Sequence, residues 1–407
     1  MFNVKSVSEV FEIISSSFSE CFLEKEGISL RNAAGRITAD EVLAIEDVPA
    51  FNRSSMDGYA VISSDTFGSS DAIPAVLKLV DEVEMGVTPK FTLEKGQAAY
   101  IPTGGELPKG ADAVVMIEYT ENYNDGFIYI NKPSAPGNNV VFKGDDVKAG
   151  SSVLKANIKL KPQDIGALAA MGYTEVSVKR KLKVGIISTG NEIVDIGEEI
   201  FGARVRDINS YTLYSGLLNY GCEAVLYGIV KDDYNEIKDR VLKALDECDV
   251  VLISGGSSVG TRDETYNVIN SLGEPGVLVH GIAVKPGKPT IIGKVKGKAV
   301  LGLPGHPASA YVIFRIFVYH LLDVMSGLSD KQYNKTMAVL KCNYPSNNGR
   351  EEFVPVKLES VGGKTIACPL FGKSGLITLL SSADGFVWVE RGVEGLSEQQ
   401  EVEVILF

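Results

Sequence analysis

The middle of the sequence, residues 180–326, repeats one pattern in which an apolar run is followed by a turn and a helical segment. The runs 182–189 and 249–254 both lead directly into glycine, and the run 223–230 lies between two segments with helical spacing of apolar residues. A strand, a helix and a second strand in this order form right-handed βαβ units. The pattern therefore predicts an α/β domain whose doubly wound parallel sheet is covered by helices on both faces.

The flanking segments are rich in β-branched residues, glycine and proline. The apolar runs 75–80, 97–101 and 113–117 are separated by turn signals and predict a β-rich module. After Gly327 short strands return and predict a small β-barrel or sandwich; they cover 337–341, 352–358, 378–380, 386–390 and 402–407. Helices are predicted in the first 26 residues with Ser6 or Ser8 as the cap, at 29–36, and at 161–172 with Pro162 in the first turn.

Charge and hydropathy exclude several classes of function. The formal net charge of −12 argues against a protein that holds nucleic acid across a broad surface. The five cysteines are far apart and form no CxxC pair, so neither a disulfide framework nor a structural zinc site is indicated. The N-terminal residues lack the core of a signal peptide, and the apolar stretch 311–325 is interrupted by Arg315 and too short to span a bilayer. We therefore expect a cytoplasmic protein.

Three segments near the predicted strand ends carry features of an anion site. Residues 254–260 form a glycine-rich loop, and glycines let backbone N–H groups approach a phosphate. Five lysines and no acid lie between Lys285 and Lys298, which indicates a pyrophosphate pocket. The segment 303–309 turns a strand into a helix, with Pro304 before the turn and Pro307 in the first helical turn. A plain tight turn is the alternative for the glycine loop, which does not match a P-loop.

Carboxylates in the connecting loops form the second group of candidates. They are Asp57, Asp145, Glu192 and Asp263, and together their oxygens would suit Mg²⁺. Any one of these acids is also an ordinary residue of a solvated turn. Asp232 and Asp233 follow a strand and also suit the cap of the next helix.

Taken together, the motifs resemble those of the MoeA/gephyrin E-domain family, the molybdopterin molybdenumtransferases. The glycine loop alone would also fit MogA/MoaB-type and CinA-like proteins, but the MDGYA and PTGG segments separate the chain from those. The matching stretches run in order along nearly the whole chain: VPAFNRSSMDGYAV (48–61), IPTGGELPKGADAVVMIE (101–118), GDDVKAG (144–150), STGNEI (188–193), DINS (207–210), SGGSSVGTRDET (254–265), KPGKP (285–289), LPGHPAS (303–309) and GREEF (349–353). The chain departs from the usual family pattern at His306, where asparagine is more common.

The resemblance implies a multi-domain α/β plus β protein and a homodimer with its active site at the subunit interface. The expected parts are a linking domain (27–47 and 141–178), an inserted β-rich domain (48–140), a MogA/MoaB-like α/β domain (1–26 and 179–327) and a C-terminal β-barrel (328–407). The family reaction inserts molybdate into adenylylated molybdopterin and releases AMP, with Mg²⁺ assisting. Expected partners are MogA/MoaB-type and cofactor-delivery proteins, with neither nucleic acid nor membrane.

Roles carried over by motif give a full set of expected site residues. Catalytic roles fall on Asp57, Thr103, Asp145, Glu192 and Asp263, and the Mg²⁺ ligands would be Asp57, Glu192 and Asp263. Substrate binding falls on Gly255, Gly256, Ser257, Asp232, Lys285, Lys288, Pro304, Pro307, Arg350 and Ser374. Two other functions remain open, a non-catalytic scaffold like gephyrin and a MogA-type molybdopterin adenylyltransferase.

Overall fold

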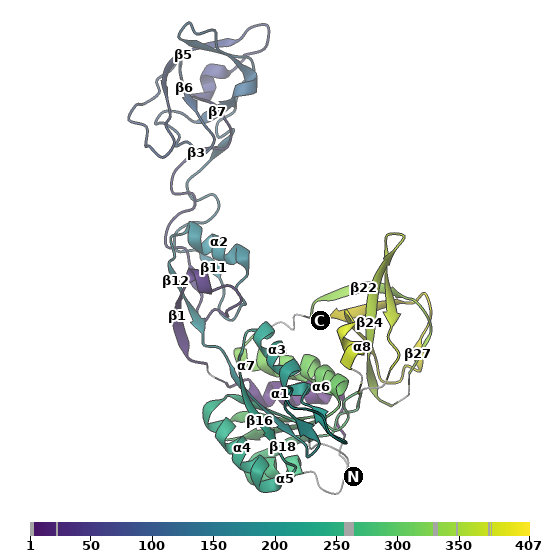
Figure 1. Ribbon diagram of the computed structural model, residues 1–407. Coiled ribbons are helices and arrows are strands. Elements are labelled where there is room, and N and C mark those ends of the chain that lie inside the picture. The colour runs from purple at the N-terminus through teal and green to yellow at the C-terminus, as the bar shows by residue number, and fades with distance from the viewer. Residues whose placement is uncertain are drawn as a thin grey trace. The chain divides into compact units, whose positions relative to one another are not determined.

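The computed structural model describes residues 4–21, 23–255, 264–328, 333–346, 349–372, 375 and 377–407 (Figure 1). The chain forms two compact units. The β-rich unit comprises Gly27–Ala34 and Thr38–Ser177, and the α/β unit comprises Met1–Glu26, Gly35–Ile37 and Val178–Phe407. The four-part division expected from the resemblance is finer than these two units and stays a prediction.

The largest sheet among the described residues of the β-rich unit has six strands, and three two-stranded sheets accompany it. Strands among its described residues pair in the order β7-β4-β6-β5-β9-β8, and the strands predicted near 75, 97 and 113 are confirmed as β5, β6 and β7. The helix predicted at 29–36 is only a 3-10 turn, η1. From residue 25 to 179 the elements are β1 (Lys25–Ser29), η1 (Leu30–Asn32), β2 (Val42–Leu43), β3 (Arg53–Ser54), β4 (Gly58–Val61), η2 (Ser63–Thr66), β5 (Ala75–Glu82), β6 (Gln97–Ile101), β7 (Ala113–Met116), η3 (Ile117–Tyr119), β8 (Thr120–Glu121), β9 (Phe127–Ile130), β10 (Val140–Val141), β11 (Ser152–Leu154), α2 (Pro162–Ala170) and β12 (Glu175–Lys179).

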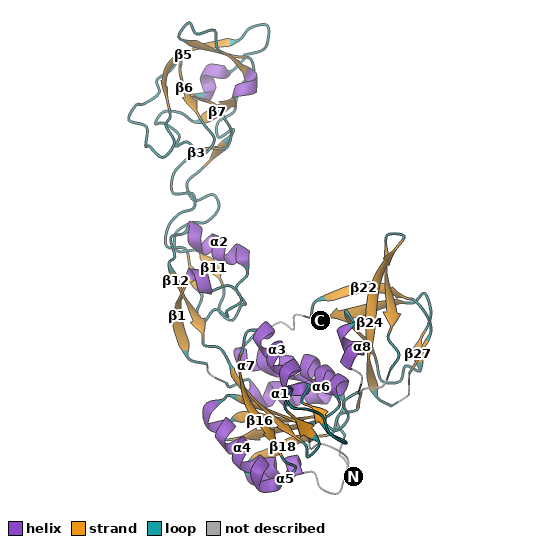
Figure 2. Ribbon diagram, in the orientation of Figure 1, coloured by secondary structure: helices purple, strands orange, loops and turns teal. Residues whose placement is uncertain are grey.

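The α/β unit contains a twisted sheet with helices on both faces (Figure 2). Its described strands pair in the order β16-β13-β17-β21-β20-β18. The elements of this part are α1 (Val7–Phe18), β13 (Lys183–Thr189), β14 (Ile193–Val194), β15 (Val205–Arg206), α3 (Asn209–Tyr220), β16 (Glu223–Val230), α4 (Tyr234–Glu247), β17 (Val250–Ser254), α5 (Glu264–Ser271), β18 (Pro275–His280), β19 (Val284–Lys285), β20 (Ile291–Val295), β21 (Lys298–Leu303), α6 (Pro307–Ile313), the π-helix η4 (Phe314–Val318) and α7 (Tyr319–Ser326).

Alternation along the central strands decides which helices cover which face. Leu252 of β17 packs in the core that contains α1, α3, α6 and α7, whereas its neighbours Val251 and Ile253 pack against α4 and α5. Because side chains of a strand point alternately to opposite faces, each β17 residue is assigned to one of the two cores by position alone. The run 250–254 is buried along its whole length, as expected for a central strand covered on both faces.

The sheet differs from the prediction at one edge. β16, β13, β17 and β21 are parallel, but β20 and β18 are antiparallel to their neighbours. A short turn at Lys296 and Gly297 joins β20 directly to β21 and leaves no room for the crossover that a parallel connection requires. The apolar run 277–284 is divided between β18 and β19, because β19 leaves this sheet and pairs with β24 of the barrel.

The C-terminal residues form the predicted barrel. Strands β24, β25, β22, β28 and β26 pair in succession, and a further pairing of β26 with β24 closes the barrel among the described residues. The strand predicted at 378–380 is wrong, because Ile377–Ser381 is the short helix α8. The elements are β22 (Lys335–Leu340), β23 (Tyr344–Pro345), β24 (Glu351–Val361), β25 (Lys364–Pro369), α8 (Ile377–Ser381), β26 (Gly385–Val389), β27 (Gly395–Leu396) and β28 (Glu401–Leu406).

The most apolar helical stretch is part of the core. Helices α6, η4 and α7 continue one another over Pro307–Ser326, which is 20 residues and long enough to cross a bilayer, so the argument from insufficient length was wrong. Burial identifies this stretch as a core helix, because 72% of its most apolar 18 residues lie inside the protein. Phe11 of α1 packs against Phe317, with ring centroids 5.3 Å apart.

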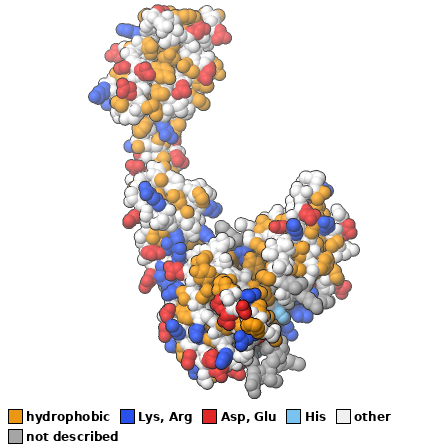
Figure 3. Space-filling model, viewed as in Figure 1, with side chains coloured by type: hydrophobic (Ala, Val, Ile, Leu, Met, Phe, Trp, Pro, Cys, Tyr) orange, Lys and Arg blue, Asp and Glu red, His pale blue; other side chains and the backbone are white. Residues whose placement is uncertain are grey.

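On the face drawn in Figure 3, acidic and basic side chains are interspersed over each unit.

An ion pair fixes the amino ends of the two central strands. The Arg180 guanidinium donates to both carboxylate oxygens of Asp249 at 2.7 and 2.8 Å, and the backbone N–H of Lys183 donates to the same carboxylate at 2.8 Å. Burial opposes ionisation of Asp249, but the hydrogen bonds from Arg180 and Lys183 outweigh it and hold the pKa of this carboxyl below its usual range. The charged pair therefore ties the start of β13 to the start of β17.

We predict that Asp249→Asn lowers the free energy of unfolding by about 1–3 kcal/mol at pH 7, because a hydrogen-bonded charge is removed. The folded-state pKa is depressed, so this stabilisation is present above the unfolded value of about 3.9 and is lost as the pH falls through the folded value. Urea denaturation at pH 7 and at pH 3 measures both effects.

The control is Glu403→Gln, which breaks the exposed pair of Lys335 and Glu403 in the barrel. An exposed pair of this kind contributes about 0–1 kcal/mol. An Asp249→Asn loss no larger than that of the control, or a loss that does not shrink between pH 7 and pH 3, would contradict the assignment.

Candidate functional site

The carboxyl ends of the parallel strands form one edge of the sheet in the α/β unit. Asn209, at the start of α3, is buried below this edge and joins two of its loops. Its side-chain amide donates to the hydroxyl of Ser254 and to the backbone carbonyl of Gly305, both at 2.8 Å. The carboxylate of Asp207 accepts from the backbone N–H of Ser210, in the first turn of α3, at 3.0 Å.

Gly255 directly follows β17 and lies against the backbone of Thr189 at the end of β13. Its φ is +105°, in the region that favours glycine, and a Cβ at this position would lie 2.1 Å from the carbonyl oxygen of Thr189. No larger residue fits without moving backbone. The hydroxyl of Thr189 lies beside Gly255, is buried, and has no hydrogen-bond partner among the described residues. An unsatisfied buried hydroxyl next to a glycine turn suits a polar ligand group at this edge.

The structure brings several predicted residues to this edge. Glu192 follows the end of β13, Asp232 follows β16, and Pro304 follows β21. Glu192 and Asp232 are exposed, and the neighbouring Asp233 caps α4 with bonds to two backbone N–H groups. Four predicted residues lie outside the described residues: Gly256, Ser257, Asp263 and Ser374.

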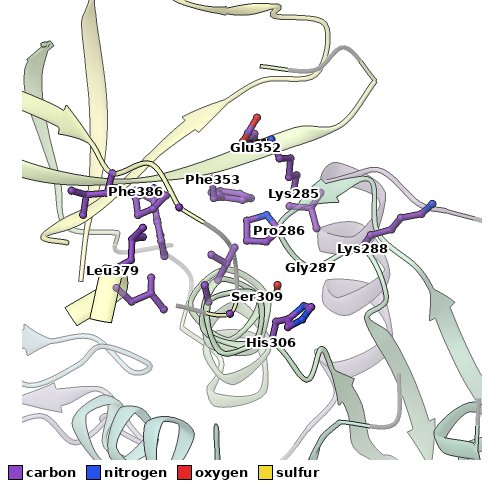
Figure 4. Close-up of a pocket in the computed structure, with 18 of the residues that line it drawn as sticks. Lys285, Pro286, Gly287, Lys288, His306, Ser309, Glu352, Phe353, Leu379 and Phe386 are labelled. Carbon is purple, nitrogen blue, oxygen red and sulfur yellow. Dashed lines mark ion pairs between the residues drawn. The ribbon is translucent and has the colours of Figure 1, made fainter. Parts of the chain in front are cut away.

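A cleft of about 770 Å³ lies within the α/β unit, between the α/β domain that carries the parallel sheet and the C-terminal barrel (Figure 4). Lys285, Lys288 and Arg350 line it, so three predicted cationic residues meet there although 62 positions separate Lys288 from Arg350. Pro307 begins α6, and its neighbours on both sides, His306 and Ala308, line the same cleft. Much of the remaining wall is apolar and includes Phe353, Phe371, Leu379, Leu380 and Phe386.

The lysine-rich segment does not act as one cluster. Lys294 donates to the backbone carbonyl of Ser17 at 2.6 Å, and Lys298 donates to the carbonyl of Leu245. These acceptors lie in α1 and α4, on opposite faces of the sheet. The prediction of one pocket for all five lysines was therefore wrong, because strand alternation separates them. Lys285 and Lys288 remain at the cleft.

A buried carboxylate that the sequence analysis did not single out lies at the same cleft. Glu352 of β24 is 4% exposed and pairs with the ammonium group of Lys285, whose Nζ is 2.8 Å from Oε1. A signal for it exists in the sequence, because alternation places Glu352 on the same face of β24 as Val354 and Val356 in the barrel core. An acid on an apolar strand face is unusual and requires partners.

Three predicted residues lie in the β-rich unit, and two of them, Asp57 and Thr103, form a hydrogen-bonded pair. The carboxylate of Asp57 accepts from the backbone N–H of Thr103 at 2.7 Å and from its hydroxyl at 3.0 Å. These two bonds, the backbone bond first, lower the pKa of the Asp57 carboxyl. Asp145 is also exposed and accepts from the backbone N–H of Phe142 at 2.7 Å. Asp57 and Asp145 are thus loop carboxylates with free oxygen lone pairs.

The predicted magnesium site stays a prediction. Asp57 belongs to the β-rich unit, Glu192 to the α/β unit, and Asp263 lies outside the described residues. In the described part of the chain, no group of three His, Cys, Asp or Glu side chains is placed to hold a metal. Asp57 and Glu192 are exposed carboxylates, a donor type that Mg²⁺ accepts.

Three family models match the chain in succession. They are described as "MoeA N-terminal region (domain I and II)" at residues 5–172, "Probable molybdopterin binding domain" at 185–323, and "MoeA C-terminal region (domain IV)" at 337–407. Their order follows the chain from its first helix to the barrel. The Gly255 edge lies in the second match, and the cleft lies between the second and the third.

Individual relatives are similar over nearly the full length. The molybdopterin molybdenumtransferase of Bacillus subtilis is 30% identical over 95% of this chain and 91% of its own. Two crystal structures of molybdopterin biosynthesis MoeA protein from Pyrococcus horikoshii also match. One has a TM-score of 0.82 at 41% identity and covers 99% of both chains. The other has a TM-score of 0.87 at 33% identity and covers 100% of both.

We predict that Gly255→Ala destabilises the α/β unit by about 2 kcal/mol or more, because the added methyl group meets a backbone oxygen that cannot move freely. Gly297→Ala is the matched control. Its φ of +82° is also positive, but a Cβ there has nothing within 4 Å. The loss of stability in Gly297→Ala therefore measures the cost of placing alanine at a positive φ alone, about 1 kcal/mol.

Urea denaturation of both variants measures the difference. Equal losses of stability in the two variants would show that the contact with Thr189 adds nothing beyond backbone conformation.

Proposed function

Because the chain belongs to the MoeA family, we propose that it is a molybdopterin molybdenumtransferase of molybdenum cofactor biosynthesis. Its substrates are adenylylated molybdopterin, molybdate and water. The dithiolene sulfurs replace oxygen of molybdate, which leaves as water, and a water oxygen attacks the phosphoanhydride so that AMP is released. The protein acts in the cytoplasm as a homodimer. A MogA/MoaB-type adenylyltransferase supplies the adenylylated substrate, and a delivery protein receives the product.

The observation that carries the proposal is the cleft between the α/β domain and the barrel. Lys285, Lys288 and Arg350 line it together, in a chain with a net charge of −12. Cations concentrated in one concave site attract anions even when the whole protein is acidic. Molybdate and a substrate with phosphate groups are both anions, and the apolar wall suits a ring that must leave water.

The edge at Gly255 supports binding of the phosphates. The missing Cβ of Gly255 lets the end of β17 lie against the backbone of Thr189, whose buried hydroxyl has no hydrogen-bond partner among the described residues and can donate to a phosphate oxygen. Asn209 holds this edge in place through its bonds to Ser254 and Gly305. Gly256, Ser257, Asp232, Pro304 and Pro307 complete the proposed substrate contacts, with Ser374 from the barrel.

Acidic residues provide the remaining chemistry. In the proposed dimer, Asp57, Thr103 and Asp145 of one subunit approach Glu192 and Asp263 of the other. Asp57, Glu192 and Asp263 would hold Mg²⁺, and a lowered pKa keeps Asp57 ionised for that purpose. When bound, the ion supplies positive charge to the phosphoanhydride oxygens. Thr103 orients the Asp57 carboxylate, and Lys285, Lys288 and Arg350 stabilise charge on the substrate oxygens.

We predict that the purified protein releases AMP from adenylylated molybdopterin when molybdate is added, and does not consume ATP with molybdopterin. Separation of nucleotides by HPLC measures both reactions, and thermal shift measures binding. Consumption of ATP would indicate a molybdopterin adenylyltransferase instead. Binding of adenylylated molybdopterin without release of AMP would indicate a scaffold.

We predict that Asp57→Asn lowers the rate of AMP release by about 10–1000-fold, because it removes a charge that acts on the reacting groups. Thr103→Val keeps the backbone donor but loses the hydroxyl, so its loss is about 2–10-fold. The control is Asp125→Asn in the same unit, whose carboxylate also accepts two hydrogen bonds and has a lowered pKa. A comparable loss in Asp125→Asn, or full activity in Asp57→Asn, would contradict the role of Asp57.

A further inference from the structure

We propose that Glu352 is a positioning residue that holds the ammonium group of Lys285 in the orientation needed to bind an anionic substrate. The inference rests on the proposed function, because it assigns Lys285 to substrate binding. Glu352 itself does not touch the substrate; it acts through Lys285.

Glu352 is the acceptor at the centre of three hydrogen bonds. Its Oε1 accepts from the Lys285 ammonium and from the Tyr344 hydroxyl, both at 2.8 Å. Its Oε2 accepts from the Ser346 hydroxyl at 2.8 Å. Both carboxylate oxygens are therefore fixed, and the carboxylate has no freedom to follow Lys285 if that side chain moves.

Burial explains why this arrangement is rigid. The Glu352 side chain is 5% exposed, whereas that of Lys285 is 43% exposed. A buried carboxylate is stable in its ionised form only with nearby donors and a counter-charge, which these three side chains provide. Burial, followed by the hydrogen bond to Glu352, raises the pKa of Tyr344, so its hydroxyl stays protonated and continues to donate.

The backbone places the two charged residues in register. β19 pairs with β24 in parallel, with Lys285 opposite Glu352 and Val284 opposite Glu351. Lys285 comes from the α/β domain and Glu352 from the barrel, so this pairing determines the position of the ammonium group relative to both walls of the cleft. In Figure 4 Lys285 points to Glu352, whereas Lys288 extends away from it.

The donor count leaves Lys285 able to bind a ligand. An ammonium group has three N–H donors, and Glu352 accepts only one of them. The side chain has a flexible stem, so an unanchored ammonium group would sample many positions. With one donor fixed on a buried acceptor, the other two are restricted in direction, and less entropy is lost when an anion binds.

Two other roles for Glu352 predict opposite effects of its removal on ligand binding. As a purely structural residue, Glu352 would stabilise the barrel, and its loss would weaken ligand binding whether or not Lys285 is present. As a competing counter-ion, it would neutralise Lys285, and its loss would tighten anion binding. A positioning residue weakens binding when it is removed, but only while Lys285 is present.

The test is a double-mutant cycle with inorganic pyrophosphate as the probe and titration calorimetry as the measurement. In the Lys285 background, Glu352→Gln should weaken pyrophosphate binding by about 5–20-fold, in the usual range for coupled neighbours. In the Lys285→Met background, the same change should alter binding by less than about twofold. Equal weakening in both backgrounds, or tighter binding in Glu352→Gln, overturns the proposal. So does a wild-type protein that fails to bind pyrophosphate.

Two further variants keep the test independent of folding. Glu359→Gln, on the same strand, breaks the exposed pair with Lys341 and should leave pyrophosphate binding unchanged. If Glu352→Gln does not fold, Tyr344→Phe loosens Glu352 without touching either charge and should weaken binding by about 2–5-fold, again only with Lys285 present. Equal weakening by Tyr344→Phe in both backgrounds contradicts the proposal.

Turnover separates this inference from the proposed function. AMP release from adenylylated molybdopterin is measured for the same variants. If the pyrophosphate cycle shows coupling but neither the wild type nor any variant releases AMP, the positioning role stands and the proposed reaction fails. If the wild type releases AMP but the cycle shows no coupling, only the role of Glu352 fails.

Discussion

The contact between Gly255 and the carbonyl oxygen of Thr189 is the constraint on which the α/β site depends. It brings Gly255 against the end of β13, with a separation at which no side chain fits. Asn209 then joins the end of β17 to the loop after β21 through Ser254 and Gly305. Parallel strands end at the same edge of a sheet. The contact between Gly255 and Thr189 and the buried Asn209 amide therefore hold the ends of β13, β17 and β21 in fixed positions.

The charge of the cleft is set by local structure and not by composition. Lys285, Lys288 and Arg350 line it, while Lys294 and Lys298 donate to backbone carbonyls elsewhere. Glu352 is buried at this cleft, and its carboxylate accepts hydrogen bonds from Lys285, Tyr344 and Ser346. The same strand pairing, β19 with β24, joins the two walls of the cleft and brings Lys285 to Glu352.

Predictions from the sequence succeeded where local patterns were strong. Apolar periodicity located α1, α4, β13, β16 and β17, and Ser6 forms the capping box that begins α1. They failed where tertiary contacts override local preference. Residues 378–380 form a helix, the run 277–284 is divided between two sheets, and the helix near residue 30 is a single 3-10 turn. The run 277–284 is divided where the chain passes from one sheet to another, because β19 pairs with a strand that is distant in sequence.

The sequence by itself determined the family, the fold class and the residue types of the site, because glycine turns, strand periods and short motifs are local features. Only the tertiary structure decided which charged residues meet. Glu352 becomes the partner of Lys285 through a strand pairing across 67 positions. A pairing at that distance depends on how two domains pack, and no local pattern in the chain encodes it.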